Sequence, residues 1–341
     1  MNLSTVVDWP HVVNVIPSLR VLDLTGCSLT SAKKQQQQSL ARLNLTNLEE
    51  LHLSGNQFDH PIASCWFWNL TNIKYLEALG AITALQYLDL SHNPIKMPTA
   101  TLMNLCHLWY LDLEGCSLNC NVTEVIEGLP QCSSNGLEEL HLGSGQLVGT
   151  LPNSMVHLTG LAVLDLSHNN ITGPLPAFIG NFTSLKTLNL AFNLITGDVP
   201  HEIAGMSSLI KLDLSKNDLQ GLITEEHFAG LNSLQYIDLS HNSLKIEMNS
   251  EWQHSFRLYY ASFATCQMGP LFPGWLQWHV DLYYLDLSRT GIIDTLPHWF
   301  SKAFSKVQYL YISDNQLGGS LPTDVEMISL CWKFSLSIPT N

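Results

Sequence analysis

Leucines recur along this 341-residue chain with a spacing that restricts the fold more than any other feature. The run L-R-V-L-D-L at residues 19–24 returns as L-E-E-L-H-L at residues 48–53. Further copies begin at Leu85, Leu108, Leu137, Leu161, Leu185, Leu209, Leu234, Leu258, Leu282 and Val307. From Leu137 onward every step is 24 or 25 residues. A period of this length predicts small units that bury their apolar sides only against their neighbours, and hence one stacked array.

Each unit follows the longer pattern L-x-x-L-x-L-x-x-N-x-L. Alternating leucines predict a short strand with one buried face, so stacked units form a parallel sheet. We expect the ninth residue to turn inward, where an Asn amide donates to and accepts from the backbone of adjacent coils and a Cys thiol is a weaker substitute. Asn stands there at Asn56, Asn93, Asn169, Asn193, Asn217, Asn242 and Asn315, and Cys at Cys27, Cys116 and Cys266.

The second half of many units carries the further motif L-x-G-x-[LIV]-P, as in L-V-G-T-L-P at 147–152 and I-T-G-P-L-P at 171–176. With these motifs the chain resembles leucine-rich repeat proteins of the plant-specific class. Within that class it resembles the ectodomains of plant receptor-like proteins of the disease-resistance type. The resemblance implies an α/β fold: a right-handed solenoid with a curved parallel sheet on its concave side and irregular or 3-10 segments on its convex side.

The repeats predict one domain at 1–325, with about twelve units, and a non-repeat tail at 326–341. Irregularities are expected at 73–84, where a unit lacks its second half, and at 117–136, where there is an insertion. The sequence begins in the middle of a repeat unit, and no cysteine-paired cap precedes that unit. We therefore interpret the chain as a fragment of a longer receptor, truncated at both ends. The alternative is a naturally short protein with frayed ends.

The charge balance disfavours one class of partner. The 29 acidic residues outnumber the 15 basic ones, and the net charge of −14 argues against nucleic acid as a partner. The sequence contains no run of about 18 apolar residues, so no membrane helix is predicted. The first residues do not have the pattern of a secretory signal. By resemblance, the full-length parent is expected at the cell surface or plasma membrane, and no cofactor is expected.

Two kinds of residue bear on the compartment. The sequons at Asn44, Asn69, Asn121, Asn170 and Asn181 are candidate N-glycosylation sites. Three of them, Asn44, Asn69 and Asn181, precede a repeat by four residues, which places them on the outer side. Cys120 and Cys132 share one insertion and are candidates for a short disulfide, whereas Cys116 and Cys120 lack the second pair that a zinc site needs.

Tyrosines supply the candidate binding site. Positions three, five and seven of each strand point away from the core. Position three holds Tyr236, Tyr260, Tyr284 and Tyr309 on successive strands, with Tyr259, Tyr283 and Tyr311 beside them. Tyrosine combines a large contact area with few rotatable bonds and a hydroxyl, which suits recognition. The alternative interpretation is that these rings merely stack on one another across strands.

Catalysis is not predicted. Position five carries a repeated Asp, and neighbours such as Asp213 and Asp238 would lie about 5 Å apart, a spacing that retaining glycosidases also use. The Asp belongs to the repeat itself, however, and so cannot mark one active centre. His52 and His141 are at least three strands apart, too far for one metal ion.

Three functions remain open. The favoured one is extracellular recognition of a peptide, glycan or protein, with signalling through a partner co-receptor kinase, as the resemblance to plant receptor-like proteins in defence or developmental signalling implies. The second is a soluble inhibitor of cell-wall-degrading enzymes, which such repeats also resemble. The third is a truncated gene product without a function of its own.

Overall fold

The structure, a computed structural model, describes residues 2–6, 9–30, 45–58, 84–95, 102–103, 105–130 and 136–319. The chain divides into two compact units, Met1–Ile171 (unit 1) and Thr172–Asn341 (unit 2). Each unit is described by itself, and the leucine pattern did not indicate this division. The predicted tail at 326–341 and nearly all of the irregular segment 73–84 lie outside the described residues.

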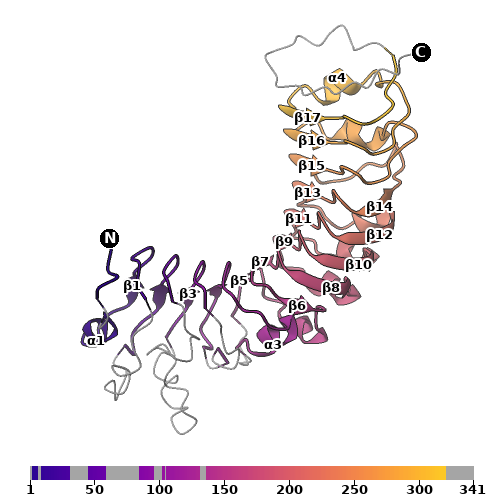
Figure 1. Cartoon of the computed structure of the whole chain (residues 1–341). Coiled ribbons are helices and arrows are strands. Elements are labelled where there is room, and N and C mark those ends of the chain that lie inside the picture. The colour runs from indigo at the N-terminus through magenta and orange to yellow at the C-terminus, as the bar shows by residue number, and fades with distance from the viewer. Residues whose placement is uncertain are drawn as a thin grey trace. The chain divides into compact units, whose positions relative to one another are not determined.

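Unit 1 contains a parallel sheet of very short strands, one per repeat (Figure 1). In sheet order they are β1 (Val21–Asp23), β2 (Glu50–His52), β3 (Tyr87–Asp89), β4 (Tyr110–Asp112), β5 (Glu139–His141) and β7 (Val163–Asp165). In each strand the central leucine is buried and its two neighbours are at least partly exposed. The predicted alternation is therefore confirmed, and the leucines form the common core.

The other described elements of unit 1 precede or connect these strands. They are α1 (Trp9–Asn14), α3 (Val122–Glu127), β6 (Val148–Gly149), the 3-10 helix η5 (Asn153–His157) and the first residues of β8 (Asn170–Pro174). Helix α3 lies inside the predicted insertion 117–136. Its N-cap Asn121 accepts a hydrogen bond from the Thr123 amide at 2.9 Å, and Glu124 lies in the first turn, which is favourable at a helix start.

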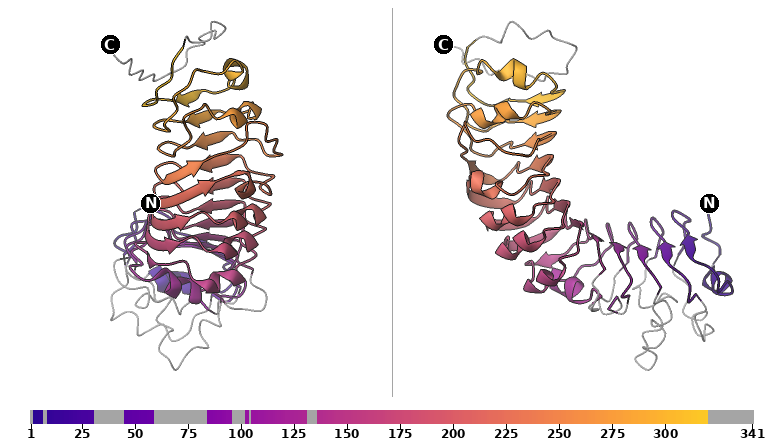
Figure 2. Two further views of the ribbon diagram at one scale, coloured as in Figure 1. Left: turned by 90° about the vertical axis from the view of Figure 1, so that its right-hand side faces the viewer. Right: turned by 180° about the vertical axis from the view of Figure 1, so that it is seen from behind.

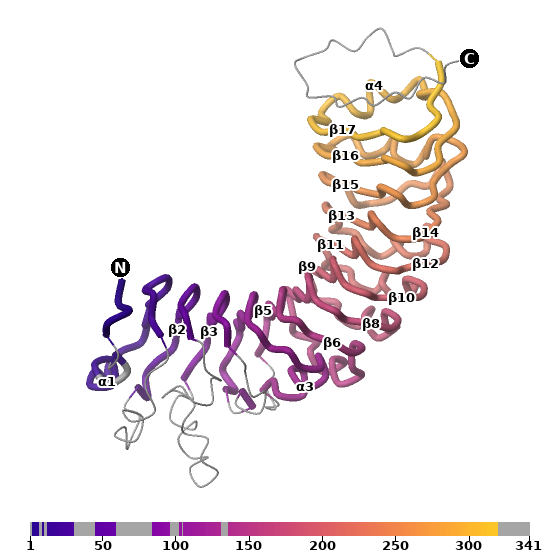
Figure 3. The backbone as a smooth tube through the Cα atoms, viewed as in Figure 1, coloured from indigo at the N-terminus to yellow at the C-terminus, as the bar shows by residue number. Residues whose placement is uncertain are grey.

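Unit 2 repeats the same plan with greater regularity. Its main sheet is parallel, in the order β9 (Thr187–Asn189), β11 (Lys211–Asp213), β13 (Tyr236–Asp238), β15 (Tyr260–Ser262), β16 (Tyr284–Asp286) and β17 (Tyr309–Tyr311). Figure 3 shows the successive coils of the chain that place these strands side by side. The predicted order, one strand per repeat and all parallel, is confirmed.

A second parallel sheet lies across the earlier coils of unit 2 from the first, as far as β14 (Figure 2). Within this unit it contains β10 (Leu194–Asp198), β12 (Asp218–Ile223) and β14 (Ser243–Ile246). Short helices follow: the 3-10 helices η6 (Ala177–Asn181), η7 (His201–Gly205), η8 (Glu225–His227) and η9 (Gly274–Trp278), and α4 (Phe300–Ala303). The predicted 3-10 segments are therefore confirmed, whereas the second sheet was not predicted.

The ninth-position asparagines form a buried ladder that ties coil to coil, as predicted. Asn217 Nδ2 donates to the carbonyls of Leu190, Leu214 and Ser215, and its Oδ1 accepts from the Ile195 amide at 3.0 Å. Cysteine takes the same place with less hydrogen bonding, because Cys266 Sγ donates only to the Leu239 carbonyl at 3.2 Å.

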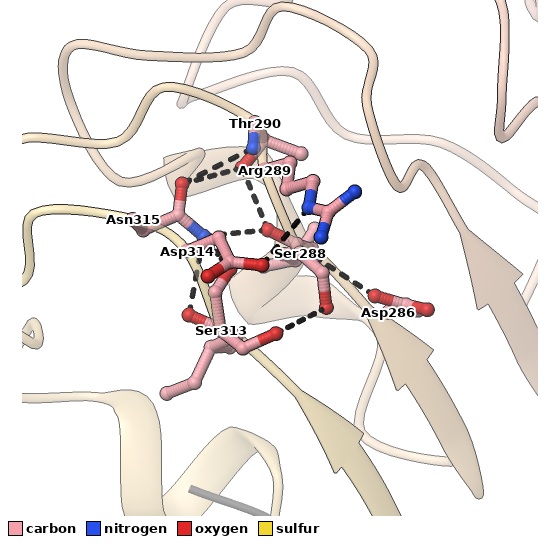
Figure 4. A network of polar contacts seen from close by, with 9 residues as sticks. Asp286, Ser288, Arg289, Thr290, Ser313, Asp314 and Asn315 are labelled. Atoms are coloured by element: carbon pink, nitrogen blue, oxygen red, sulfur yellow. Dashed lines mark hydrogen bonds and ion pairs between the residues drawn. The ribbon is translucent and has the colours of Figure 1, made fainter. Parts of the chain in front are cut away.

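The last described rung of this ladder uses a hydroxyl as well (Figure 4). Thr290 Oγ1 donates to the Leu287 carbonyl at 2.8 Å, and Asn315 Oδ1 accepts from the Thr290 and Ile292 amides. The side-chain oxygens of Thr290 and Asn315 therefore both have partners, which is the condition for burying polar groups at low cost.

Each repeat then turns through a residue in the left-handed region at position eight. Glycine stands there in Gly26, Gly55 and Gly115, but most repeats use a residue with a side chain, such as His168 (φ 54°) or His241 (φ 56°). The Ser-His-Asn motif that recurs at 91–93, 167–169 and 240–242 thus marks a turn.

Candidate functional site

The seven tyrosines singled out above lie on the open face of the unit 2 sheet, and we call this surface the tyrosine face: Tyr236, Tyr259, Tyr260, Tyr283, Tyr284, Tyr309 and Tyr311. Strand register brings them together, because Tyr236 pairs with Tyr260, Tyr260 with Tyr284, and Tyr284 with Tyr309. Parallel register at a 24-residue period therefore converts a sequence repeat into a row of adjacent rings.

The rings form two stacked columns. In the first column, the ring centroids of Tyr236 and Tyr260 are 4.1 Å apart and those of Tyr260 and Tyr284 are 4.3 Å apart, with nearly parallel planes. In the second, Tyr259 and Tyr283 stack at 4.9 Å. Tyr309 contacts both columns, edge-on to Tyr283 at 5.2 Å and tilted to Tyr284 at 6.2 Å. The stacking alternative is thus correct for ring–ring contact, yet Tyr259 remains 53% exposed and Tyr309 40% exposed.

Carboxylates line the first column. The Tyr236 hydroxyl donates to Asp213 Oδ2 and the Tyr260 hydroxyl to Asp238 Oδ2, each at 3.4 Å. Burial, together with these negative charges, raises the pKa of both phenols, so they remain neutral donors. Burial, with a contribution from the Asp213 charge, raises the pKa of Asp238 to about 6.

The recurring Asp at position five has a structural role in each repeat. Asp238 Oδ1 accepts from the Ser240 amide at 2.9 Å, and Asp286 Oδ1 accepts from the Ser288 amide in the same way. The Asp side chain thus closes its own turn in one repeat after another, which agrees with its interpretation as a residue of the repeat.

The side chain of Lys211 provides a positive charge at the Tyr236 end of the first column. Lys211 Nζ lies 4.9 Å from the ring centroid of Tyr236, a cation–π contact, and Lys211 is on β11, next to β13. The tyrosine face therefore combines aromatic surface, neutral hydroxyl donors, carboxylates and one ammonium group, which suits a ligand of mixed polarity.

Sequence reasoning missed a second aromatic group, on the sheet of unit 1. Tyr87 and Tyr110 stack at 4.0 Å with planes 5° apart, and His52 and His141 lie against their outer sides at 4.5 and 5.3 Å. The signal was present in the sequence, because Tyr87 and Tyr110 occupy position three of consecutive repeats. The two histidines had been considered only as metal ligands.

The predicted glycosylation sites differ in their surroundings. Asn170 and Asn181 are exposed, and their glycosylation stays a prediction. Asn121 is partly buried as the cap of α3, and its amide leaves no room for a Cβ at Gly149. Asn44 and Asn69 lie outside the described residues.

The structure contradicts the predicted Cys120–Cys132 disulfide. Cys120 has a free thiol, as do the ninth-position cysteines Cys27, Cys116 and Cys266. Cys106 is disulfide-bonded instead. Spacing within one insertion was therefore a poor guide; helix α3 lies between the two positions in the sequence, and Cys132 lies outside the described residues.

Two further searches covered the described residues. In those ranges no three His, Cys, Asp or Glu side chains are grouped so as to hold a metal ion. Among the described helices, none has the length and apolar composition needed to cross a membrane.

Comparison with known families identifies the fold family. A profile described as leucine rich repeat matches residues 135–195 and 183–244, and a second one matches 47–70, 84–105 and 306–327. Together they match just over half of the chain. The chain belongs to the leucine-rich repeat family.

Its curated relatives are plant receptor-like proteins. Receptor-like protein EIX1 of tomato (Solanum lycopersicum) is 36% identical over 108 residues, which is 32% of this chain and 10% of that protein. Receptor-like protein 1 of Arabidopsis thaliana is 26% identical over 250 residues, or 73% of this chain and 16% of that protein. The chain thus spans about a tenth to a sixth of the length of these relatives.

Solved structures support the same fold. The ectodomain of the Arabidopsis receptor kinase HAESA, solved with an IDA peptide hormone, has a TM-score of 0.68 and 24% identity, covering 90% of this chain and 52% of that one. The ectodomain of the Arabidopsis thaliana receptor kinase GASSHO1/SCHENGEN3, solved with CASPARIAN STRIP INTEGRITY FACTOR 2, has a TM-score of 0.65 and 23% identity, covering 90% and 37%.

Proposed function

We propose that this chain is an extracellular recognition domain of a plant receptor-like protein, and that its tyrosine face contacts a peptide, glycan or protein ligand. The observation that carries the proposal is the convergence of seven tyrosines on one open face. Only part of their area is used in mutual stacking, since about half of Tyr259 and two fifths of Tyr309 remain exposed. Their role in binding is itself part of the proposal.

The geometry favours a tight contact at low entropic cost. Rings already held at 4.1 and 4.3 Å from one another lose little conformational freedom when a ligand binds. The Tyr236 and Tyr260 hydroxyls stay protonated and donate to the buried carboxylates of Asp213 and Asp238, which helps to hold both rings in place. A peptide supplies both the amide donors and the apolar side chains that match such a surface.

Of the three proposed kinds of ligand (peptide, glycan or protein), the comparisons favour a peptide. The HAESA and GASSHO1/SCHENGEN3 ectodomains, which share this fold, were each solved with a peptide or factor bound. HAESA was also solved with the co-receptor SERK1. We extend this to the parent of the present chain: a plasma-membrane glycoprotein acting in plant defence or developmental signalling, without a kinase of its own and in need of a co-receptor kinase.

A peptide display library of random dodecamers, selected on the purified chain, tests the proposal. Peptides that bind should lose about tenfold or more in affinity to the Tyr284→Ala variant, because an aromatic at the centre of an interface is typically worth about 2 kcal/mol. Trp278→Ala is the matched control, since it removes a ring that is 41% exposed on η9. It should change affinity less than about twofold.

Equal affinity of the selected peptides for wild type and Tyr284→Ala would contradict the proposal. So would a larger loss in Trp278→Ala, because the contact would then lie on the other side of the coil.

A further inference from the structure

The four central strands of unit 1 carry a symmetric arrangement of side chains. Register pairs Glu50, Tyr87, Tyr110 and Glu139 in one row, and His52, Asp89, Asp112 and His141 in the next. The two inner strands thus present tyrosine and aspartate, and each outer strand presents glutamate and histidine. We call this surface the acidic aromatic face.

Aromatic rings form the floor of this face. Tyr87 and Tyr110 stack at 4.0 Å, and Trp109 meets them edge-on at 5.8 and 5.7 Å. His52 and His141 close the two ends of the stack. Trp109 is 37% exposed, so part of a large ring is available to a partner.

Carboxylates surround the rings without a resident cation. In the six described strands of the unit 1 sheet, positions three, five and seven hold seven carboxylates and no Lys or Arg. The nearby Arg20 lies at position two of its repeat and pairs with Glu49. Glu50 and Glu139 contact His52 and His141 at 3.4 and 3.3 Å.

The carboxylates of the inner strands repel one another. Asp112 Oδ1 accepts from the Glu114 amide at 2.8 Å, and its Oδ2 accepts from the Tyr110 hydroxyl at 3.3 Å. Burial raises the pKa of Asp112, and the charge of Asp89 on the next strand adds to this. A positive group placed here would relieve the repulsion.

Unit 2 shows which chemistry fits such a stack. There, the end of the tyrosine column lies under the ammonium group of Lys211, on the strand that also carries Asp213. The corresponding strands in unit 1, β2 and β5, carry glutamate in place of this lysine.

We propose that the acidic aromatic face of unit 1 binds an arginine-containing, basic peptide segment. The guanidinium group donates to the carboxylates of Asp89 and Asp112 and to the phenol oxygens, while the arginine stem packs on Trp109. Guanidinium is favoured over ammonium because it is planar, presents five donors and is weakly hydrated, which suits a flat surface of rings and carboxylates. The net charge of −14 assists the approach of a basic segment. This site is independent of the proposed role of the tyrosine face.

Fluorescence anisotropy with the full chain tests the proposal. The probe is a labelled Gly-Arg-Gly-Arg-Gly peptide, and the matched probes carry citrulline or lysine in place of arginine. Citrulline keeps the shape of arginine and removes its charge, so the citrulline peptide should bind at least tenfold more weakly than the arginine peptide. The affinity of the lysine peptide should lie between the two. Affinity for the arginine peptide should also fall as salt rises from 50 to 300 mM.

Two variants of the chain then test whether the peptide binds at this face. The Asp89→Asn/Asp112→Asn double variant keeps the shape of both side chains and should bind the arginine peptide at least tenfold more weakly. The control Asp165→Asn changes the same repeat position on β7, two strands from β4, and should change affinity less than twofold.

Equal binding of the citrulline and arginine peptides, or full affinity in the double variant, would overturn the proposal. The citrulline comparison uses the wild-type chain only, so it decides the matter even if the double variant does not fold.

Discussion

The two units build aromatic stacks from the same repeat position but surround them differently. In unit 2, four successive strands carry tyrosine at position three, and Lys211 covers the end of the stack. Among the described strands of the unit 1 sheet, only β3 and β4 do so, and glutamate and histidine flank them on both sides. The backbone therefore fixes ring spacing in both units, whereas the neighbouring strands determine the charge that a ligand meets.

The largest expected effect tests what the units share. Asn217→Ala in unit 2 and Asn169→Ala in unit 1 should each lower the free energy of unfolding by about 3 to 5 kcal/mol, because each leaves several buried backbone groups without partners. Chemical denaturation measures the loss. Asn217→Cys is the matched control and should lose less, since cysteine fills this position at Cys266. A loss below about 1 kcal/mol in either Ala variant would contradict the role of the ladder.

Acid should destabilise unit 2 through a pair that has no described counterpart in unit 1. His254 and His279 stack at 4.2 Å, and neither Nε2 has a hydrogen-bond partner. Burial lowers the pKa of both imidazoles in the folded state, and for His279 the neighbouring His254 adds to this. Protons therefore bind the unfolded chain preferentially below pH 6.5, and stability falls as the pH falls.

A histidine that stays neutral when folded should lower the folding equilibrium constant about thirtyfold at pH 5. Denaturation at pH 7, 6 and 5, with hydrogen exchange to locate the loss in unit 2, measures this. His279→Phe should flatten the pH dependence, and the exposed control His241→Gln should not. An acid-dependent loss that survives in His279→Phe would show that other groups are responsible.

The ring stacks should contribute similarly in the two units. Tyr260→Ala removes stacking on both sides and should cost about 1 to 2 kcal/mol, and Tyr110→Ala should cost a similar amount. Tyr309→Ala, at the tilted end of the column, should cost less. Thermal or urea unfolding of the three variants measures the difference. A larger loss in Tyr309→Ala than in Tyr260→Ala would contradict the stacking account.

The smallest effect concerns buried charge. The pKa of Asp238 is raised to about 6, so its contribution to stability is greatest below the unfolded value of 3.8 and is lost as the pH rises through about 6. Asp238→Asn should therefore raise stability by about 1 kcal/mol at pH 7, with no gain at pH 4. Asp23→Asn in unit 1 should bring no such gain, because hydrogen bonds from Thr25 lower the pKa of Asp23. Unfolding of both variants at the two pH values decides this.

Features that repeat could be predicted from the sequence, and features that occur once could not. The strand at each leucine run, the inward asparagine and the row from Tyr236 to Tyr309 all depend on a fixed period, so one unit defines the rest. The stacked pair His254–His279 joins a loop to the residue that follows η9. The two residues lie one period of 25 residues apart, but the repeat motif itself places no histidine there. The free thiol of Cys120 and the division of the chain at Ile171 are likewise single features that no repeat predicts.

Part of the candidate site was visible for the same reason. Tyr236, Tyr260 and Tyr284 share one repeat position, and their contact required only parallel register. The acidic aromatic face was missed because its character comes from combining positions three and five across four strands, with histidine joining the tyrosine stack.

One binding comparison tests the central claim most directly. The affinity of display-selected peptides that contain no arginine or lysine is measured for wild type, Tyr260→Ala/Tyr284→Ala in unit 2, and the matched Tyr87→Ala/Tyr110→Ala in unit 1. If the tyrosine face is the recognition surface, the unit 2 variant should lose tenfold or more and the unit 1 variant less than about twofold. Unchanged affinity in the unit 2 variant, or an equal loss in both, would contradict it.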